Sequence, residues 1–235
     1  MSGDPDAWRS LGLVVDDDGL VALHGTCLRI RADSGPLAGH DRDDDHDEVA
    51  GPSGITGWTL SGIDAELLSS APSRASSIAD DPSSNVSSSN IFSIDGLATE
   101  VVPGGHPVFA AHRLGAIGLD HVVVMTSQLD RTSAAIAEAT GCELKRIREV
   151  GSMRQGFHRI GSGGLIVELV ERPEVPDGPA AFWGLVINVD DLDAACALLG
   201  DGRISSPKDA VQPGRRIATI RNDVGLGLPV ALMTP

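Results

Sequence analysis

Residues 118–130 read GLDHVVVMTSQLD, and this stretch decides the fold because its pattern recurs later in the chain. Three consecutive valines, Val122 to Val124, are typical of a buried strand. His121 is a single polar side chain at the entrance of that strand. The stretch predicts a strand over 119–126, followed by a helix over 129–139.

The same order of elements returns at an offset of 63 residues, where Leu129-Asp130 recurs as Leu192-Asp193. Glycines at the turns separate the apolar runs that follow each helix. We interpret each copy as one strand, one helix and three further strands, or βαβββ. The two copies, over 118–173 and 180–235, form one two-module domain.

The N-terminal half, residues 1–112, is predicted to be a degenerate unit of similar type. SLGLVVDDDGLVALHGTCLRIR indicates strands joined by an Asp-Gly turn, and GITGWTLSGIDAELLSSA indicates a strand followed by a helix. DGLATEVVP and HPVFAAHRL are candidates for the remaining strands. An acidic stretch at 39–48 and a serine-rich stretch at 73–90 are predicted to be loops, because neither buries enough apolar surface to offset its ordering entropy.

The composition excludes several classes of function. The chain has 33 acidic and 18 basic residues, a formal charge of -15, and this charge repels nucleic acid and anionic lipid. The N-terminus lacks the pattern of a signal peptide, and no apolar run is long enough to span a bilayer. Cys27, Cys142 and Cys196 match no metal or redox spacing. We therefore expect a cytoplasmic protein with reduced thiols, without nucleic-acid or membrane partners.

The repeated unit, with a histidine in the first strand and a glutamate in the last, resembles the vicinal oxygen chelate (VOC) superfamily of glyoxalase I, bleomycin-resistance and extradiol-dioxygenase proteins. LDHVVVMTSQLD and GLIVELVERP carry the resemblance in the first copy, and FWGLVINVDDLD and GLPVALMTP in the second. The resemblance covers 118–235 well and the N-terminal half loosely. It implies an α+β fold of tandem βαβββ modules that form an open half-barrel with a central cleft.

The resemblance also implies a divalent metal, Zn, Ni, Mn or Fe(II), held by residues of the first and last strands of each module. His121 and Glu168 match these ligand positions in the first copy. The corresponding residues of the second copy are Gly184 and Ala231, and neither has a side chain that binds a metal. His158, in GFHRIG, is a candidate third ligand. We therefore predict an incomplete metal site and favour a protein without a metal cofactor.

Other interpretations of the first-copy pair stay open. One alternative is that His121 is a half-buried histidine whose ring bonds a backbone carbonyl. Glu168 is an ordinary solvated acid if its side chain points outward, and has a raised pKa or a cationic partner if it points inward. Without a metal, the two side chains together are also suited to general acid–base chemistry.

Candidate substrate-binding residues are Trp183, Arg215 and Arg216. Arginines at a cleft rim bind carboxylates or phosphates, although they also balance surface acid in so acidic a chain. The acidic loop contains His40 and His46 but lacks the glycine and spacing of a calcium loop, so we interpret it as solvated.

These observations favour a protein of unknown substrate that binds a small organic molecule in the half-barrel cleft. The alternative is a metal-dependent lyase, isomerase or dioxygenase that uses His121 and Glu168. A structural paralogue with a filled cleft is a third hypothesis. A homodimer is compatible with all three.

Overall fold

The computed structural model describes residues 4–30, 54–61, 91–102, 109–161 and 164–235. The acidic loop, the serine-rich loop and the helix predicted after GITGWTLSG lie outside these ranges. The chain divides into two compact units, each described by itself below. Unit 1 comprises 1–55, 106–122 and 183–235, and unit 2 comprises 56–105 and 123–182.

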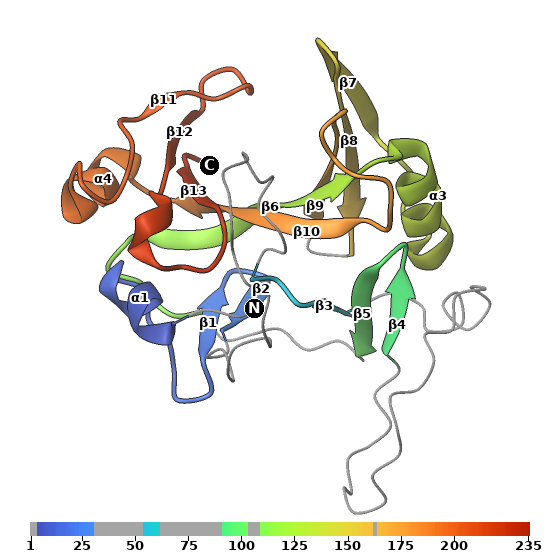
Figure 1. Cartoon of the computed structure of the whole chain (residues 1–235). Helices are drawn as coiled ribbons and strands as arrows, with labels where there is room; N and C mark the ends of the chain where they lie inside the picture. Colours follow the sequence, from blue (N-terminus) through green and yellow to red (C-terminus); the bar gives the residue numbers. More distant parts are fainter. Residues whose placement is uncertain (1–3, 31–53, 62–90, 103–108, 162–163) are drawn as a thin grey trace, which may run out of the picture. The chain divides into compact units, whose positions relative to one another are not determined.

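The first βαβββ copy has the predicted elements (Figure 1). They are β6 (Ala116–Thr126), α3 (Leu129–Thr140), β7 (Arg146–Val150), β8 (Met153–Ile160) and β9 (Leu165–Glu171). The strand order is β6-β9-β8-β7, with β8 antiparallel to both β7 and β9. Helix α3 ends at Gly141, whose φ of 67° is the left-handed conformation that favours glycine after a helix.

The second copy repeats this arrangement. Its elements are β10 (Ala181–Val189), α4 (Leu192–Leu199), β11 (Lys208–Asp209), β12 (Arg216–Thr219) and β13 (Val230–Met233), with a short 3-10 helix, η1 (Asn222–Val224), before β13. The strand order β10-β13-β12-β11 is the same, first, fourth, third and second. The predicted repeat is therefore confirmed. Strand β11 is only two exposed residues long, so no apolar pattern marks it in the sequence.

The repeated Leu-Asp pair has the same structural role in both modules. Leu129 and Leu192 are buried at the start of the two helices. The neighbouring aspartates form ion pairs with arginines of the third strand of their module, Asp130 with Arg154 at 3.0 Å and Asp193 with Arg216 at 2.8 Å. Each helix is thereby held to the sheet of its own module.

The N-terminal part forms smaller elements. Helix α1 (Pro5–Ser10) and the antiparallel hairpin of β1 (Leu20–Leu23) and β2 (Thr26–Arg29) belong to unit 1. Strands β3 (Trp58–Ser61), β4 (Ile91–Ile94) and β5 (Leu97–Val102) form a sheet of order β3-β5-β4 in unit 2. The description of this half as a degenerate VOC-like unit stays a prediction.

Two local predictions in this half are wrong. The hairpin turns at His24-Gly25, because Leu23 pairs with Thr26. The Asp-Gly sequence precedes β1 instead, in a loop where the Asp16 carboxylate accepts the backbone N–H of Leu20 at 2.7 Å. HPVFAAHRL is also no strand where it is described, from residue 109 onward.

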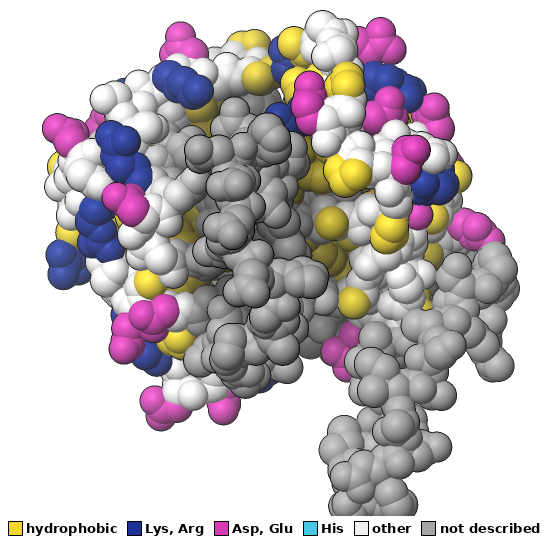
Figure 2. Space-filling model, in the orientation of Figure 1, with side chains coloured by type: hydrophobic (Ala, Val, Ile, Leu, Met, Phe, Trp, Pro, Cys, Tyr) yellow, Lys and Arg dark blue, Asp and Glu magenta, His cyan; other side chains and the backbone are white. Residues whose placement is uncertain are grey.

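The described surface has mixed charge. On the face shown in Figure 2, acidic and basic side chains are interspersed rather than gathered by sign. None of the helices in the described part of the chain has the length and apolar character needed to cross a lipid bilayer.

Candidate functional site

His121 is held by the residue before it in the sequence. Its Nδ1 lies 2.7 Å from the Oδ2 of Asp120, on the buried part of β6. Burial acts to raise the pKa of the Asp120 carboxyl, but the hydrogen bonds from His121 and Arg215 outweigh it and lower the pKa to about 2. Because an ionised carboxylate only accepts hydrogen bonds, the ring nitrogen Nδ1 of His121 carries a proton and donates it to Asp120.

The other carboxylate oxygen of Asp120 binds two more side chains. Its Oδ1 accepts from Arg215 Nη2 at 2.7 Å and from Asn188 Nδ2 at 3.1 Å. Arg215 Nη2 also donates to Asn188 Oδ1, and its Nε donates to the Thr234 carbonyl, each at 2.7 Å. We call Asp120, His121, Asn188 and Arg215 the Asp120 network. All four residues belong to unit 1.

An apolar cluster lies beside the Asp120 network on the sheet of the second module. It consists of buried Val186, Ala231 and Met233, with half-buried Ala210 and Ile217 packed against them. Val186 and Asn188 share one face of β10, and Asn188 is paired with Met233 in the register. Apolar residues beside a few fixed polar groups are the usual composition of a small-molecule site.

In unit 2, Glu168 and His158 lie on opposite faces of the same sheet. The register pairs Phe157 with Glu168 and His158 with Val167, and directly paired residues share a face. Since successive side chains alternate, Glu168 and His158 point apart. Glu168 accepts a hydrogen bond from Gln155 Nε2 at 2.5 Å.

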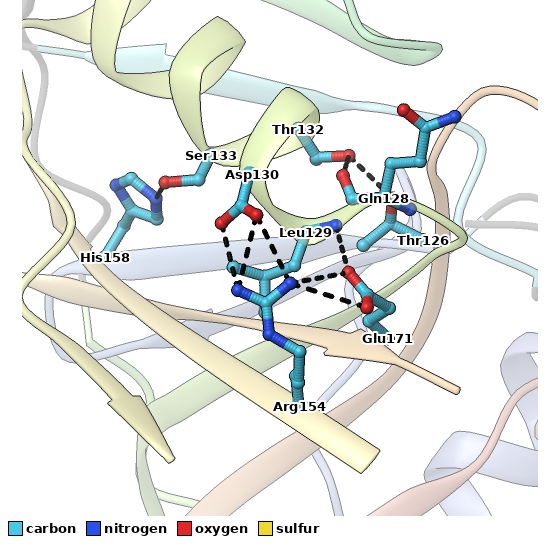
Figure 3. Close-up of polar contacts among 9 residues, drawn as sticks. All are labelled: Thr126, Gln128, Leu129, Asp130, Thr132, Ser133, Arg154, His158 and Glu171. Atoms are coloured by element: carbon cyan, nitrogen blue, oxygen red, sulfur yellow. Dashed lines mark hydrogen bonds and ion pairs between the residues drawn. The ribbon is translucent and has the colours of Figure 1, made fainter. Parts of the chain in front are cut away.

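His158 is instead a buried structural residue under α3 (Figure 3). Its Nδ1 donates to the Cys142 carbonyl and its Nε2 accepts from the Ser133 hydroxyl, each at 2.9 Å. Burial lowers the pKa of the His158 imidazole, which favours the neutral form that these two bonds require. The structure therefore does not bring His158 to Glu168 as a further ligand.

The second acid of β9, Glu171, holds the start of α3 (Figure 3). Its Oε2 accepts the backbone N–H of Leu129 at 2.6 Å, and Arg154 bridges Glu171 to Asp130. These contacts satisfy a backbone N–H group at the start of the helix and give the Glu171 carboxylate a structural role that does not require a ligand.

The three predicted substrate-binding residues have different surroundings. Arg215 belongs to the Asp120 network, whereas the neighbouring Arg216 is an exposed side chain paired with Asp193. Trp183 is 38% exposed and shares a face of β10 with buried Leu185 and Ile187, the face opposite that of Asn188. Of the three, only Arg215 is placed with His121.

The order of strands decides the fold type, since both modules have the sequence βαβββ and the order first, fourth, third, second. The fold is VOC-like. No protein-family model matches the sequence, and a search of curated proteins gave no match.

Several solved structures with VOC-like folds are similar to this chain. Methylmalonyl-CoA epimerase from Mycobacterium tuberculosis is 19% identical over 52% of this chain and 89% of its own, with a TM-score of 0.44. A variant of the Streptomyces coelicolor epimerase, in complex with 2-nitronate-propionyl-CoA, is 20% identical over 51% of this chain and 97% of its own, with a TM-score of 0.42. A mutant 4-hydroxymandelate synthase from Streptomyces coelicolor is 18% identical over 61% of this chain and 59% of its own, with a TM-score of 0.45.

The second module of this VOC-like chain does not fit a metal. A Cβ atom on Gly184 would lie 2.7 Å from the Pro229 carbonyl oxygen, so the backbone occupies the space of a side chain there. Ala231, at the other ligand position, is part of the apolar cluster. Within the described residues, no group of three or more His, Cys, Asp and Glu side chains is arranged to hold a metal ion. We therefore derive no chemical step through a metal.

Sequence reasoning did not single out Asp120 or Asn188. Asp120 stands directly before His121 in GLDHVVV, and Asn188 is one polar residue within the apolar run FWGLVINV. Both could have been found as polar residues within apolar strands, because buried polar side chains are uncommon unless they are hydrogen-bonded.

Proposed function

We propose that this chain binds a small organic molecule through the Asp120 network, on a VOC-like fold whose metal site is incomplete. One observation carries the proposal. A buried, ionised Asp120 fixes the positions of His121, Asn188 and Arg215 directly beside an apolar cluster. That the ligand lies in a half-barrel cleft is part of the same proposal.

The physical argument is preorganisation. Arg215 has three of its hydrogen bonds committed to Asp120, Asn188 and Thr234, so its position is set before any ligand arrives. The hydrogen bond to Asp120 fixes the ring orientation and tautomer of His121. Side chains held in this way lose little conformational entropy on binding, which favours affinity.

A second candidate function is a metal-dependent lyase, isomerase or dioxygenase that uses His121 and Glu168. The observation in its favour is the Asp120–His121 hydrogen bond, because metal-binding histidines commonly donate their other ring N–H to a carboxylate. Zn, Ni, Mn and Fe(II) are the metals suited to a histidine and a carboxylate. Gly184 and Ala231 weigh against it.

Elemental analysis separates the two functions. The protein is purified without a metal-affinity tag, beside a His121→Ala variant. We expect no stoichiometric metal in either. About one equivalent of a transition metal in the wild type, lost in the variant, would replace the binding function with the enzyme.

Thermal shifts with a panel of small organic acids and aromatic compounds test binding itself. We expect at least one compound to stabilise the wild type, because a ligand that binds only the folded state raises the melting temperature. Arg215→Met should abolish this shift, and Arg216→Met, the matched control, should keep it. If Arg215→Met does not fold, Asn188→Leu is tested in its place, because this change leaves the Asp120–Arg215 ion pair intact. A panel without any shift contradicts the proposal.

The cytoplasmic location and the homodimer stay predictions. Size-exclusion chromatography with light scattering checks the second.

A further inference from the structure

Arg215 has one donor group that the Asp120 network does not use. Its Nη2 donates to Asp120 and to Asn188, and its Nε donates to the Thr234 carbonyl, each at 2.7 Å. These three hydrogen bonds use every N–H group of the guanidinium except the two on Nη1. Nη1 makes no hydrogen bond with any residue that the structure describes, so the charged end of Arg215 still offers two donors.

Solvent reaches this unused group. The Arg215 side chain is 18% exposed. Within the described ranges, the buried side-chain nitrogens and oxygens that lack a hydrogen-bond partner belong to Trp8, Ser127 and Gln155. Nη1 also lacks a partner but is not one of these buried atoms, so it is open to solvent. A ligand can therefore contact Nη1 without breaking a hydrogen bond of the network.

Partly exposed apolar side chains share the face of the second module on which Arg215 lies. Ile217, two residues further along, is on this face because side chains alternate along a strand. Ala210 is directly opposite Arg215, since its backbone N–H donates to the Arg215 carbonyl at 2.8 Å. Ala210 and Ile217 are half-buried and pack against the apolar cluster. A ligand held at Arg215 thus has apolar side chains beside it.

Charged residues are divided between the two faces of β11 and β12. Lys208 is paired with Ile217 and is exposed, so it brings a second positive charge to the face of Arg215. The next pair, Asp209 and Arg216, belongs to the opposite face. The acid of β11 is therefore directed away from Arg215, whereas the base of β11 lies on the same face.

We propose that the ligand is a small organic carboxylate, one oxygen of which accepts a hydrogen bond from Nη1 of Arg215. Asp120 neutralises one of the two positive charges of Arg215 and Lys208, so one charge is left for a singly charged anion. The apolar body of the ligand contacts Ala210 and Ile217. All of these residues belong to unit 1. This inference rests on the proposed binding function and adds the chemical class of the ligand.

Matched pairs of probes test the inference, because the members of each pair have nearly the same shape and differ in charge. Benzoate is compared with benzamide, and hexanoate with hexanamide, by isothermal titration of the wild type at low ionic strength. We expect the carboxylate of at least one pair to bind about tenfold tighter, the effect of one charge-assisted hydrogen bond. Arg215→Met should lower the carboxylate affinity to that of the amide or below it.

Lys208 supplies a test that does not depend on the folding of Arg215→Met. Lys208→Met removes an exposed charge from the face of Arg215 and should weaken carboxylate binding about threefold, without changing the affinity for the amide. Arg216→Met removes the same charge from the opposite face of the same strand pair. It is the matched control and should bind both probes like the wild type. Added salt should reduce the effect of Lys208→Met.

The outcomes separate this inference from the function on which it rests. Equal affinity within both pairs, a preference that survives Arg215→Met, or equal effects of Lys208→Met and Arg216→Met overturn the carboxylate inference and leave the binding function standing. Tighter binding of phenyl phosphate than of benzoate assigns the site to doubly charged anions and also overturns the inference. No binding by any of these compounds, or by the panel above, overturns both.

Discussion

The two modules have the same strand order but carry different residues at corresponding points. The first has His121 and Glu168 where the second has Gly184 and Ala231. Both keep a buried leucine and an ion-paired aspartate at the start of the helix. The comparison separates two kinds of residue: those that hold a helix on its sheet are present in both modules, and those that suit a ligand are not.

The modules also begin their helices differently. In the second, Asp191 caps α4 locally, accepting the backbone N–H of Ala194 at 2.9 Å. In the first, Gln128 provides no side-chain cap, and Glu171 of the last strand accepts the N–H of Leu129. The first helix thus depends on tertiary structure for a contact that the second obtains from its own sequence.

The largest expected effect tests the claim that Arg215 and Arg216 are not equivalent. Arg215→Met removes the guanidinium that pairs with the buried charge of Asp120 and should lower the free energy of unfolding by about 4 kcal/mol. Arg216→Met removes an ion pair that is exposed to solvent and should lower this free energy much less, because solvent screens the attraction. Urea unfolding monitored by circular dichroism measures both. Equal losses would contradict the placement of Arg215 in a buried network.

The next effect concerns pH and Asp120. Its pKa is lowered from 3.8 to about 2, so the unfolded state takes up a proton before the folded state does. The resulting stabilisation of the folded state, about 2 kcal/mol, is present above about pH 5 and is lost as the pH falls towards 2. The free energy of unfolding of Asp120→Asn should fall less over this pH range than that of the wild type. Asp223→Asn, a change at an exposed aspartate, is the control and should follow the wild type.

Gly184→Ala tests whether the second module has room for a ligand side chain. The added Cβ would meet the Pro229 carbonyl oxygen at 2.7 Å, and overpacking of this kind costs about 2 kcal/mol. Gly202→Ala adds the same group where no atom lies within 4 Å and should change the unfolding free energy by less than about 0.5 kcal/mol. Thermal unfolding compares the two. If Gly184→Ala is as stable as the control, a restored ligand at this position becomes feasible.

The smallest contrast concerns the two helix starts. Glu171→Ala removes the partner of Leu129 and of Arg154, and we expect a loss of about 2 kcal/mol. Asp191→Ala removes only a local cap, which is worth about 1 kcal/mol. Hydrogen exchange of the first-turn amides of α3 and α4 resolves the two effects. If Asp191→Ala speeds exchange in α4 more than Glu171→Ala speeds it in α3, then the local cap contributes more stability than the tertiary contact, contrary to our expectation.

The fold was predictable because apolar runs and the Leu-Asp pair repeat at one offset. Such a repeat can be recognised in the sequence without knowing which residues are in contact. Much of the candidate site was not. Nothing in the sequence distinguishes Arg215 from Arg216, since the turn before β12 decides which of them reaches Asp120. His158 and Glu168 were both plausible ligands until the register placed them on opposite faces.

Asp95, at the turn between β4 and β5, has a consequence for how the protein is made. It has a φ of 47°, and its carboxylate accepts hydrogen bonds from Arg131 and Thr132 of α3. Its carbonyl accepts the backbone N–H of Ala180 at 2.7 Å. All of these partners lie later in the chain, so the sheet β3-β5-β4 leaves the ribosome before the residues that hold it in place. The contact with Ala180 can form only after the entire first module has been synthesised.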